Sequence, residues 1–154
     1  SIQSIKKFKF KLMINFFKNK GKSKVNNDKY YSNIAALLIH AAKIDESYED
    51  EEKEIIKKTL IELGVEISDV DQLIINATDI EENSNQILNF TKEVKNAPLL
   101  DKIRIVESLW KIIYSNNIAD IYEANLMRRL AGLLYIDAKT MSNLKEKVKV
   151  KLKK

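Results

Sequence analysis

The chain has 154 residues and no cysteine, which excludes disulfides and thiolate metal sites. Three glycines and one proline are too few for the frequent turns of a β-rich fold, whereas the abundance of Leu, Ile, Lys, Glu and Ala favours helices. The net charge of +5 conceals a division, because both ends are basic while residues 31–144 hold 12 basic and 20 acidic residues. An acidic body repels phosphate, so we expect no nucleic-acid ligand.

Residues 1–28 are predicted to form a basic amphipathic helix followed by a polar linker. Apolar side chains recur at spacings of three and four, the period of one helix face: Ile2, Ile5, Phe8, Leu12 and Phe16. Lysines interrupt this stretch, which argues against a signal peptide, and the chain has no apolar run of about 18 residues to cross a membrane. Three interpretations stay open: the helix packs on the body, docks on a partner protein, or binds an anionic membrane through residues 1–20. We expect a cytoplasmic chain, peripheral at the inner face of the membrane in the third case.

Residues 29–150 have the pattern of one domain of amphipathic helices joined by short connections. Apolar periodicity predicts helices at 30–44, 51–64, 68–80, 85–96 and 99–115, then a turn and a helix within 116–136, and a last helix from 139 onward. The residues expected to mark helix ends are Gly64, Ser68, Asn83 or Ser84, and Pro98. With the N-terminal segment, the sequence predicts an all-α fold of about seven to eight antiparallel helices.

The body contains an internal repeat, which becomes visible when the sequence is shifted by 71 residues. The shift aligns apolar positions with apolar positions and acids with acids: Leu38 with Leu109, Ile55 with Leu126, Ile56 with Met127 and Glu52 with Glu123. Each half has the order helix, acidic turn, helix and the polar start of a third helix. We therefore predict two similar helix hairpins related by a pseudo-twofold axis.

The two acidic turns carry a resemblance to a known family. The first runs from Asp45 to Glu52 as DESYEDEE, and the second runs from Asn116 to Glu123 as NNIADIYE. With AALLIHAAKID before the first turn and NLMRRLAGLLYI after the second, they resemble the TerB family of tellurite-resistance proteins over nearly the whole chain. The family turn is Asp-Gly-x-apolar-x-x-x-Glu, and this chain departs from it at Glu46, Asn116 and Asn117. The resemblance implies a bacterial, all-helical domain linked to tellurite, metal or envelope stress, and no established catalytic reaction.

The acids of the two turns are candidate ligands for a divalent cation. Hard cations such as Ca²⁺, Mg²⁺ and Mn²⁺ prefer clustered carboxylate oxygens, and the hairpins can bring five of them together: Asp45, Glu49, Glu52, Asp120 and Glu123. The alternating ligands and central glycine of an EF-hand are missing. Two other interpretations stay open, because acids at a helix N-terminus favour the helix dipole and an acidic surface can dock a basic protein partner.

The sequence lacks a catalytic constellation and any motif for an organic cofactor. His40 is its one histidine, and its place beside an apolar face indicates a structural role. Arg104 and Glu107 are three residues apart on a predicted helix, so we expect a local ion pair. A hydrolase built on the acids would lack a nucleophile and a base. The leading hypothesis is a non-enzymatic binding domain with solvent-facing acidic turns, and the alternative is a peripheral membrane adaptor.

Overall fold

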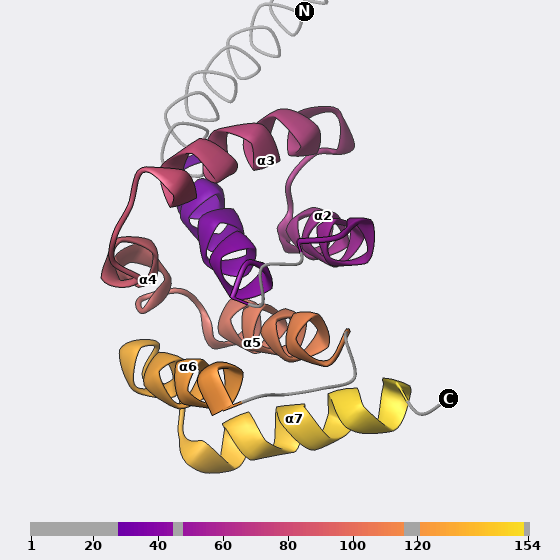
Figure 1. Ribbon diagram of the computed structural model, residues 1–154, viewed down its shortest axis with the longest axis vertical. Coiled ribbons are helices and arrows are strands. Elements are labelled where there is room, and N and C mark those ends of the chain that lie inside the picture. Colours follow the sequence, from indigo (N-terminus) through magenta and orange to yellow (C-terminus); the bar gives the residue numbers. More distant parts are fainter. Residues whose placement is uncertain (1–27, 45–47, 116–120, 153–154) are drawn as a thin grey trace, which may run out of the picture. The chain divides into compact units, whose positions relative to one another are not determined.

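A computed structural model describes residues 28–44, 48–115 and 121–152, without the side chains of residues 121–123. The chain divides into two compact units, residues 1–30 and 31–154, and only residues 28–30 of the first are described. The helix and linker predicted before residue 28, and with them the membrane interpretation, lie outside the described residues. Every regular element in the described ranges is a helix (Figure 1), which confirms the all-α prediction. No described helix is long and apolar enough to span a bilayer.

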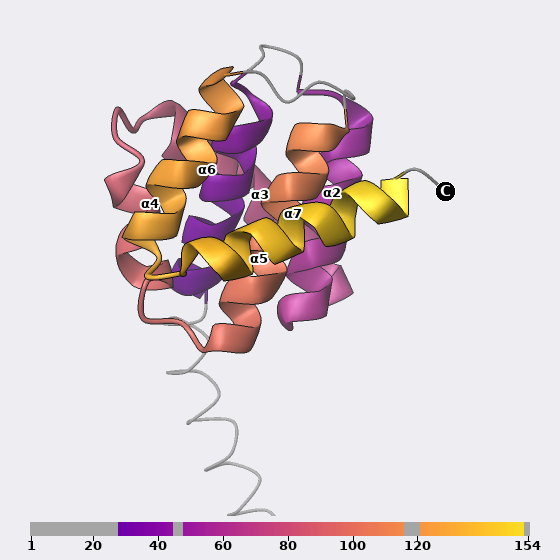
Figure 2. The same ribbon diagram turned by 90° about the horizontal axis from the view of Figure 1, so that it is seen from below.

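The described ranges contain seven helices (Figures 1 and 2). The first covers residues 28–42. The others follow in chain order: α2 (Asp50–Leu63), α3 (Ile67–Glu82), α4 (Leu88–Val94), α5 (Leu99–Tyr114), α6 (Ile121–Leu133) and α7 (Ala138–Leu152). The short helix α4 therefore stands between two sets of three longer helices.

The two sets of three helices are the structural form of the sequence repeat. After a shift of 71 residues, the helix at 28–42 corresponds to α5, α2 to α6 and α3 to α7, and each pair of boundaries agrees within one residue. Helix α4 has no counterpart among the described residues. The repeated hairpins predicted from the sequence are thus confirmed, with α4 as the connection between the halves.

The ends of α2 and α6 repeat at the level of single hydrogen bonds. A residue with a positive φ lies just beyond each helix: Gly64 directly after α2, with a φ of 122°, and Tyr135 two positions after the end of α6, with a φ of 56°. Two equivalent backbone bonds, both 2.9 Å long, close these ends in the manner of a Schellman motif: Val65 N to Leu60 O, and Ile136 N to Ala131 O. The prediction that Gly64 ends its helix is confirmed.

In each half, a side chain from the first helix donates a hydrogen bond to a backbone carbonyl group at the C-terminal end of the second helix. The hydroxyl of Tyr31 donates to the carbonyl oxygen of Leu63 at 2.9 Å. At the equivalent place Lys102 Nζ donates to the carbonyl oxygen of Leu134 at 2.8 Å. Free carbonyl groups at a helix C-terminus need such partners when they are buried. Different residue types therefore perform the same task in the two halves.

We expect Gly64→Ala to lower the free energy of unfolding by about 1–3 kcal/mol. A Cβ at this position would lie 2.9 Å from Tyr31 Oη, and a φ of 122° is one that L residues rarely adopt. The matched control is Gly132→Ala on the exposed side of α6, where a Cβ has no neighbour within 4 Å. That change should stabilise by up to about 1 kcal/mol. Urea unfolding of both variants checks the prediction, and effects of the same sign would contradict it.

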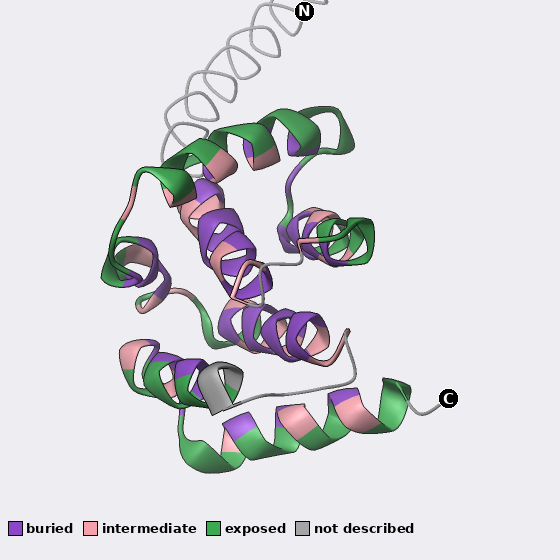
Figure 3. Ribbon diagram, viewed as in Figure 1, coloured by how far each residue is buried: buried purple, intermediate pink, exposed green. Residues whose placement is uncertain are grey.

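The helix at 28–42 and α5 form the centre of the body. Residues 34–39 have an exposure of 0% at every position, so this helix meets protein on all sides. A helix that is apolar all round is stable in water only when neighbours enclose it. Its counterpart α5 is also largely buried (Figure 3), with core side chains Ile105, Val106, Leu109, Trp110, Ile112 and Ile113. The remaining helices pack around this pair.

Two predicted helix starts are wrong. The N-cap of α3 is Glu66, because the chain turns directly from the end of α2 into α3, and Ser68 lies inside the helix. Helix α4 begins only at Leu88. Asn83 instead ends α3, where its Nδ2 donates to the carbonyl oxygen of Asp79 at 2.9 Å. Pro98 directly precedes α5, as predicted. The residue type at Asn83 correctly indicated a helix boundary, but the sequence did not show that the boundary is the end of α3 and not the start of α4.

Glu107 connects α5 to α7 instead of pairing with Arg104. Its carboxylate lies 3.5 Å from Lys147 Nζ and 3.3 Å from Lys151 Nζ. Arg104 Nη1 donates to the carbonyl oxygen of Glu62 at 2.8 Å. The predicted local ion pair is therefore wrong, because partners from other helices are in reach of both side chains.

We expect Glu107→Gln to make stability less sensitive to acid. Burial raises the pKa of Glu107, but the hydrogen bond from Lys151 and the nearby lysine charges outweigh it, so the pKa lies below the ordinary 4.5. A carboxyl group with a lowered pKa stabilises the fold above its unfolded pKa, and this contribution is lost as pH falls through the folded pKa. The loss of stability from neutral pH to below pH 4.5 should shrink by about 1 kcal/mol in the variant. Urea unfolding across this range measures it, and the exposed Glu146→Gln should leave the acid dependence unchanged.

Candidate functional site

The first acidic turn leads into α2 with a run of carboxylates. Glu49 is the N-cap residue, and Asp50, Glu51 and Glu52 form the first helical turn. Glu49, Asp50 and Glu51 are exposed. The Asp50 side chain is fully solvated and lies 4.0 Å from Lys53 Nζ. Negative charges here favour the positive end of the helix dipole. This placement supports the helix-dipole interpretation for these acids.

Glu52 differs from its neighbours because it points into the protein. Its exposure is 2%. One carboxylate oxygen accepts from the backbone N–H of Glu49 at 2.8 Å, as in a capping box. The other lies 3.3 Å from the hydroxyl of Ser115 at the end of α5. The single Ser115 proton is shared between this carboxylate and the carbonyl oxygen of Ile112, 2.6 Å away. Glu52 thus joins the start of α2 to the end of α5.

Tyr48 packs beside this buried carboxylate. Its hydroxyl oxygen is buried and has no hydrogen-bond partner among the described residues. Burial, and then the negative charge of Glu52, raise the pKa of Tyr48 above its usual value of 10.0. On the solvent side Lys53 Nζ lies 5.1 Å from the ring centroid. Glu52 and the Tyr48 hydroxyl are thus both shielded from solvent, and in such surroundings the hydrogen bonds that Glu52 accepts are stronger than in water.

The five predicted cation ligands have different outcomes. Glu49 is exposed, Glu52 is buried, and the hydrogen bond from the Glu49 amide joins them. The expectation that the acids of the first turn all face solvent is wrong for Glu52. Asp45, Asp120 and the side chain of Glu123 lie outside the described residues. The described part of the chain holds no group of three or more His, Cys, Asp or Glu side chains that could bind a metal ion.

Sequence reasoning missed the structural partner of Glu52. Ser115 lies 63 positions further along the chain, and no local pattern connects the two residues. The capping role had a signal, because Glu52 stands three residues after Glu49 at the start of an apolar-periodic segment. In an acidic turn, this spacing identifies the acid that caps the helix and is not available to bind a ligand.

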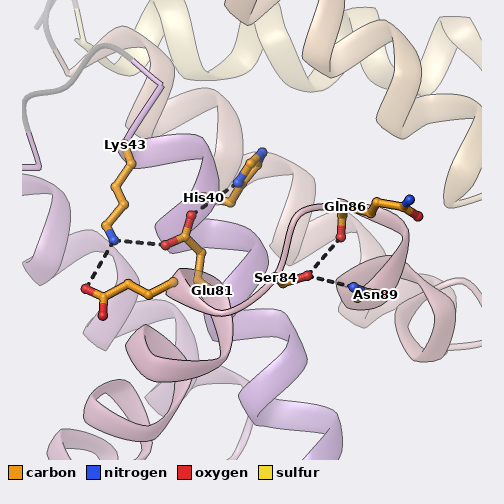
Figure 4. Close-up of polar contacts among 7 residues, drawn as sticks. His40, Lys43, Glu81, Ser84, Gln86 and Asn89 are labelled. Carbon is orange, nitrogen blue, oxygen red and sulfur yellow. Dashed lines mark hydrogen bonds and ion pairs between the residues drawn. The ribbon is translucent and has the colours of Figure 1, made fainter.

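His40 belongs to a polar cluster between the helix at 28–42 and the end of α3 (Figure 4). Its Nδ1 lies 3.3 Å from Glu81 Oε1, and the ring is 6.0 Å from that of Phe90. Lys43 Nζ donates to the other oxygen of Glu81 at 2.9 Å and lies 3.7 Å from Glu82. The hydrogen bond to Glu81 raises the pKa of Lys43, so the ammonium group stays charged. These contacts fit the structural role predicted for His40.

Comparison with known proteins identifies the family. No curated protein and no solved structure matches the chain significantly. A family model described as tellurite resistance protein TerB matches residues 31–146, well over half of the chain. The matched segment includes both acidic turns, α5, most of the helix at 28–42, and Glu52 with its partner Ser115. The chain therefore belongs to the TerB family.

Proposed function

We propose that this TerB-family chain is a non-enzymatic binding module in a tellurite or metal stress response. Its binding site is the α2 acidic surface, defined as Glu49, Asp50, Glu51 and Glu54, and its ligand is a basic surface of another protein. The observation that carries the proposal is that the acids at the start of α2 divide into exposed residues and one buried residue. The four members of the surface are exposed, whereas Glu52 supports the fold. These outward carboxylates are accessible to a partner.

The shape beside the α2 acidic surface supports a protein ligand. A hollow of about 740 Å³ runs along the outer side of α2. Ile55 and Ile61 are partly exposed within it, and its charged lining consists of three glutamates and two lysines: Glu51, Glu54, Glu62, Lys57 and Lys58. A basic amphipathic helix would place its apolar side chains on the isoleucines and its lysines on the acids. This combination recognises a peptide better than a small ion.

The arrangement of carboxylates favours a partner over a cation. Glu49, Asp50 and Glu51 are consecutive, so their side chains point in different directions around the start of the helix. A cation needs several oxygens about 2.0–2.6 Å from one point. Glu52 would have to release the amide of Glu49 to join such a site. A basic protein surface can contact the exposed acids separately.

The partner proposal is tested with a fluorescein-labelled amphipathic peptide of lysine and leucine. Anisotropy should show saturable binding that weakens with salt. Glu51→Lys/Glu54→Lys should raise the Kd at least about tenfold. The control Asp79→Lys/Glu146→Lys makes the same charge change at two other exposed positions and should stay within about twofold. Equal affinity of the two double variants would show that net charge, not this surface, binds the probe.

The link to stress is tested in cells and the cation version by calorimetry. In a strain that lacks the gene, the wild type and the control should restore tellurite tolerance, and Glu51→Lys/Glu54→Lys should not.

Titration with Ca²⁺, Mg²⁺ or Mn²⁺ should give no saturable heat. Saturable heat that is lost in Glu49→Gln would favour the cation version. Glu49→Gln is the change to make, because it removes the charge of an exposed residue and keeps an oxygen for the capping box, whereas a change at Glu52 disturbs a buried side chain.

A further inference from the structure

A second surface, chemically opposite to the α2 acidic surface, lies between α4 and α6. The two helices lie side by side (Figures 1 and 2). A groove of about 390 Å³ is lined by residues of both and of the turn after α6. Its apolar lining includes Leu88, Leu133 and Tyr135, and its charged lining consists of Lys92 and Lys95. Because α4 has no counterpart among the described residues, the first half has no equivalent of this α4–α6 surface within the described part of the chain.

The charge of the groove runs against that of the body around it. Residues 31–144 carry more acids than bases, yet among the described residues no acidic side chain lines the groove. Most lysines of the described body are close to a carboxylate or an aromatic ring. The ammonium groups of Lys92 and Lys95, by contrast, form no ion pair with any described residue. Two uncompensated cations beside apolar side chains favour a ligand that is both anionic and apolar.

Tyr135 is a second, independent sign of a binding surface. Its φ of 56° places a tyrosine in the left-handed region, where the equivalent residue of the first half is Gly64. This conformation costs a residue with a Cβ about 1–2 kcal/mol. The side chain recovers little by burial, because the residue is 70% exposed. Lys102 Nζ lies 5.7 Å from the ring centroid. A strained, exposed aromatic residue is a candidate for function.

Asn89 gives the groove a fixed polar group. Its side-chain amide donates to the hydroxyl of Ser84 at 2.6 Å, and that hydroxyl donates to the carbonyl oxygen of Gln86 (Figure 4). The chain of hydrogen bonds sets the orientation of the amide before any ligand arrives. An oriented amide oxygen is an acceptor for a peptide N–H group.

We propose that the groove between α4 and α6 binds an acidic segment of another protein through one apolar side chain and flanking carboxylates. The carboxylates pair with Lys92 and Lys95, and the apolar side chain lies against Leu88, Leu133 and the ring of Tyr135. A peptide offers both kinds of group within one short segment, together with the N–H that Asn89 accepts. The proposal does not depend on the ligand of the α2 acidic surface, which has the opposite charge.

The test uses a fluorescein-labelled, glutamate-rich peptide with one central leucine. Anisotropy should show saturable binding to the wild type, and a peptide with the leucine replaced by serine should bind at least about fivefold more weakly. Lys92→Glu/Lys95→Glu should raise the Kd at least about tenfold. The control Lys58→Glu/Lys139→Glu reverses two exposed charges elsewhere and should stay within about twofold. No saturable binding, or equal Kd values for both double variants, overturns the proposal.

Tyr135→Gly separates binding from folding. The change removes the aromatic ring and relieves the backbone, so the Kd should rise at least about fivefold while the Tm stays equal or increases. An unchanged Kd overturns the role of the aromatic surface. Other occupants have their own signatures. Lysine-dependent binding of anionic vesicles or oligothymidine but not of the peptide, or self-association that Lys92→Glu/Lys95→Glu abolishes, also overturns the proposal.

Discussion

Phe90→Ala is expected to lower the free energy of unfolding by about 3–5 kcal/mol, the largest effect of any change considered. The side chain is 1% exposed and is the largest among the most deeply buried. It belongs to α4, a helix of seven residues that is too short to persist by itself. The buried side chains of α4 are Phe90, Thr91 and Val94, so the loss of the ring removes most of what holds the helix.

Leu88→Ala is the matched control on the same helix. Leu88 is 46% exposed and lines the groove, so its truncation should cost less than about 1 kcal/mol. Urea unfolding followed by circular dichroism compares the two variants. In the peptide assay Leu88→Ala should still weaken binding, although the protein stays fully folded, because Leu88 lines the groove. Similar losses of stability would mean that the buried side of α4 does not hold it in place.

Glu52→Ala is expected to lower the free energy of unfolding by about 2–4 kcal/mol. The change removes the acceptor for the Glu49 amide and the partner of Ser115. It also leaves a void where a side chain with 2% exposure was packed. Glu52→Gln keeps the volume and one acceptor oxygen, so its cost should be smaller, about 1 kcal/mol. Urea unfolding of the wild type and both variants at neutral pH measures the two losses.

Glu51→Ala distinguishes this structural role from a general effect of acidic charge. Glu51 is adjacent, equally charged and exposed, and its replacement should change stability by less than about 0.5 kcal/mol. If Glu51→Ala and Glu52→Ala cost the same, the acids act through the helix dipole and the buried contacts contribute nothing. A large cost for Glu52 alone supports using Glu49, and not Glu52, in every ligand-binding test.

The repeat shows how far local pattern leads. Apolar periodicity located the helices, and the shift of 71 residues predicted that their boundaries would recur. It also paired Leu63 with Leu134, whose carbonyl oxygens turned out to be equivalent acceptors. The donors, Tyr31 and Lys102, escaped notice because their chemistry differs although their positions correspond. The two donors therefore occupy equivalent positions of the repeat although their residue types differ.

The lysines of α7 illustrate a limit of composition. A lysine-rich end is by composition typical of a solvated tail. In the structure Lys145 Nζ lies 5.5 Å from the ring of Trp110, and Lys149 Nζ lies 5.6 Å from the ring of Tyr114. Their aliphatic stems and charges cover the aromatic side of α5. Whether a lysine is solvated depends on what the neighbouring helix presents.

The sequence by itself determined the helices, their duplication, the acidic turn and the family, because each of these depends on residues close together in the chain or on a regular shift along it. The tertiary structure decided which carboxylate of the turn is a ligand candidate. Glu49 and Glu52 are both acidic and only one turn apart, yet one is solvated and the other is buried against Ser115. It also decided that Lys92, Lys95 and Tyr135 line one groove. Burial and charge at these places are set by helices from distant parts of the chain, and no local pattern carries that information.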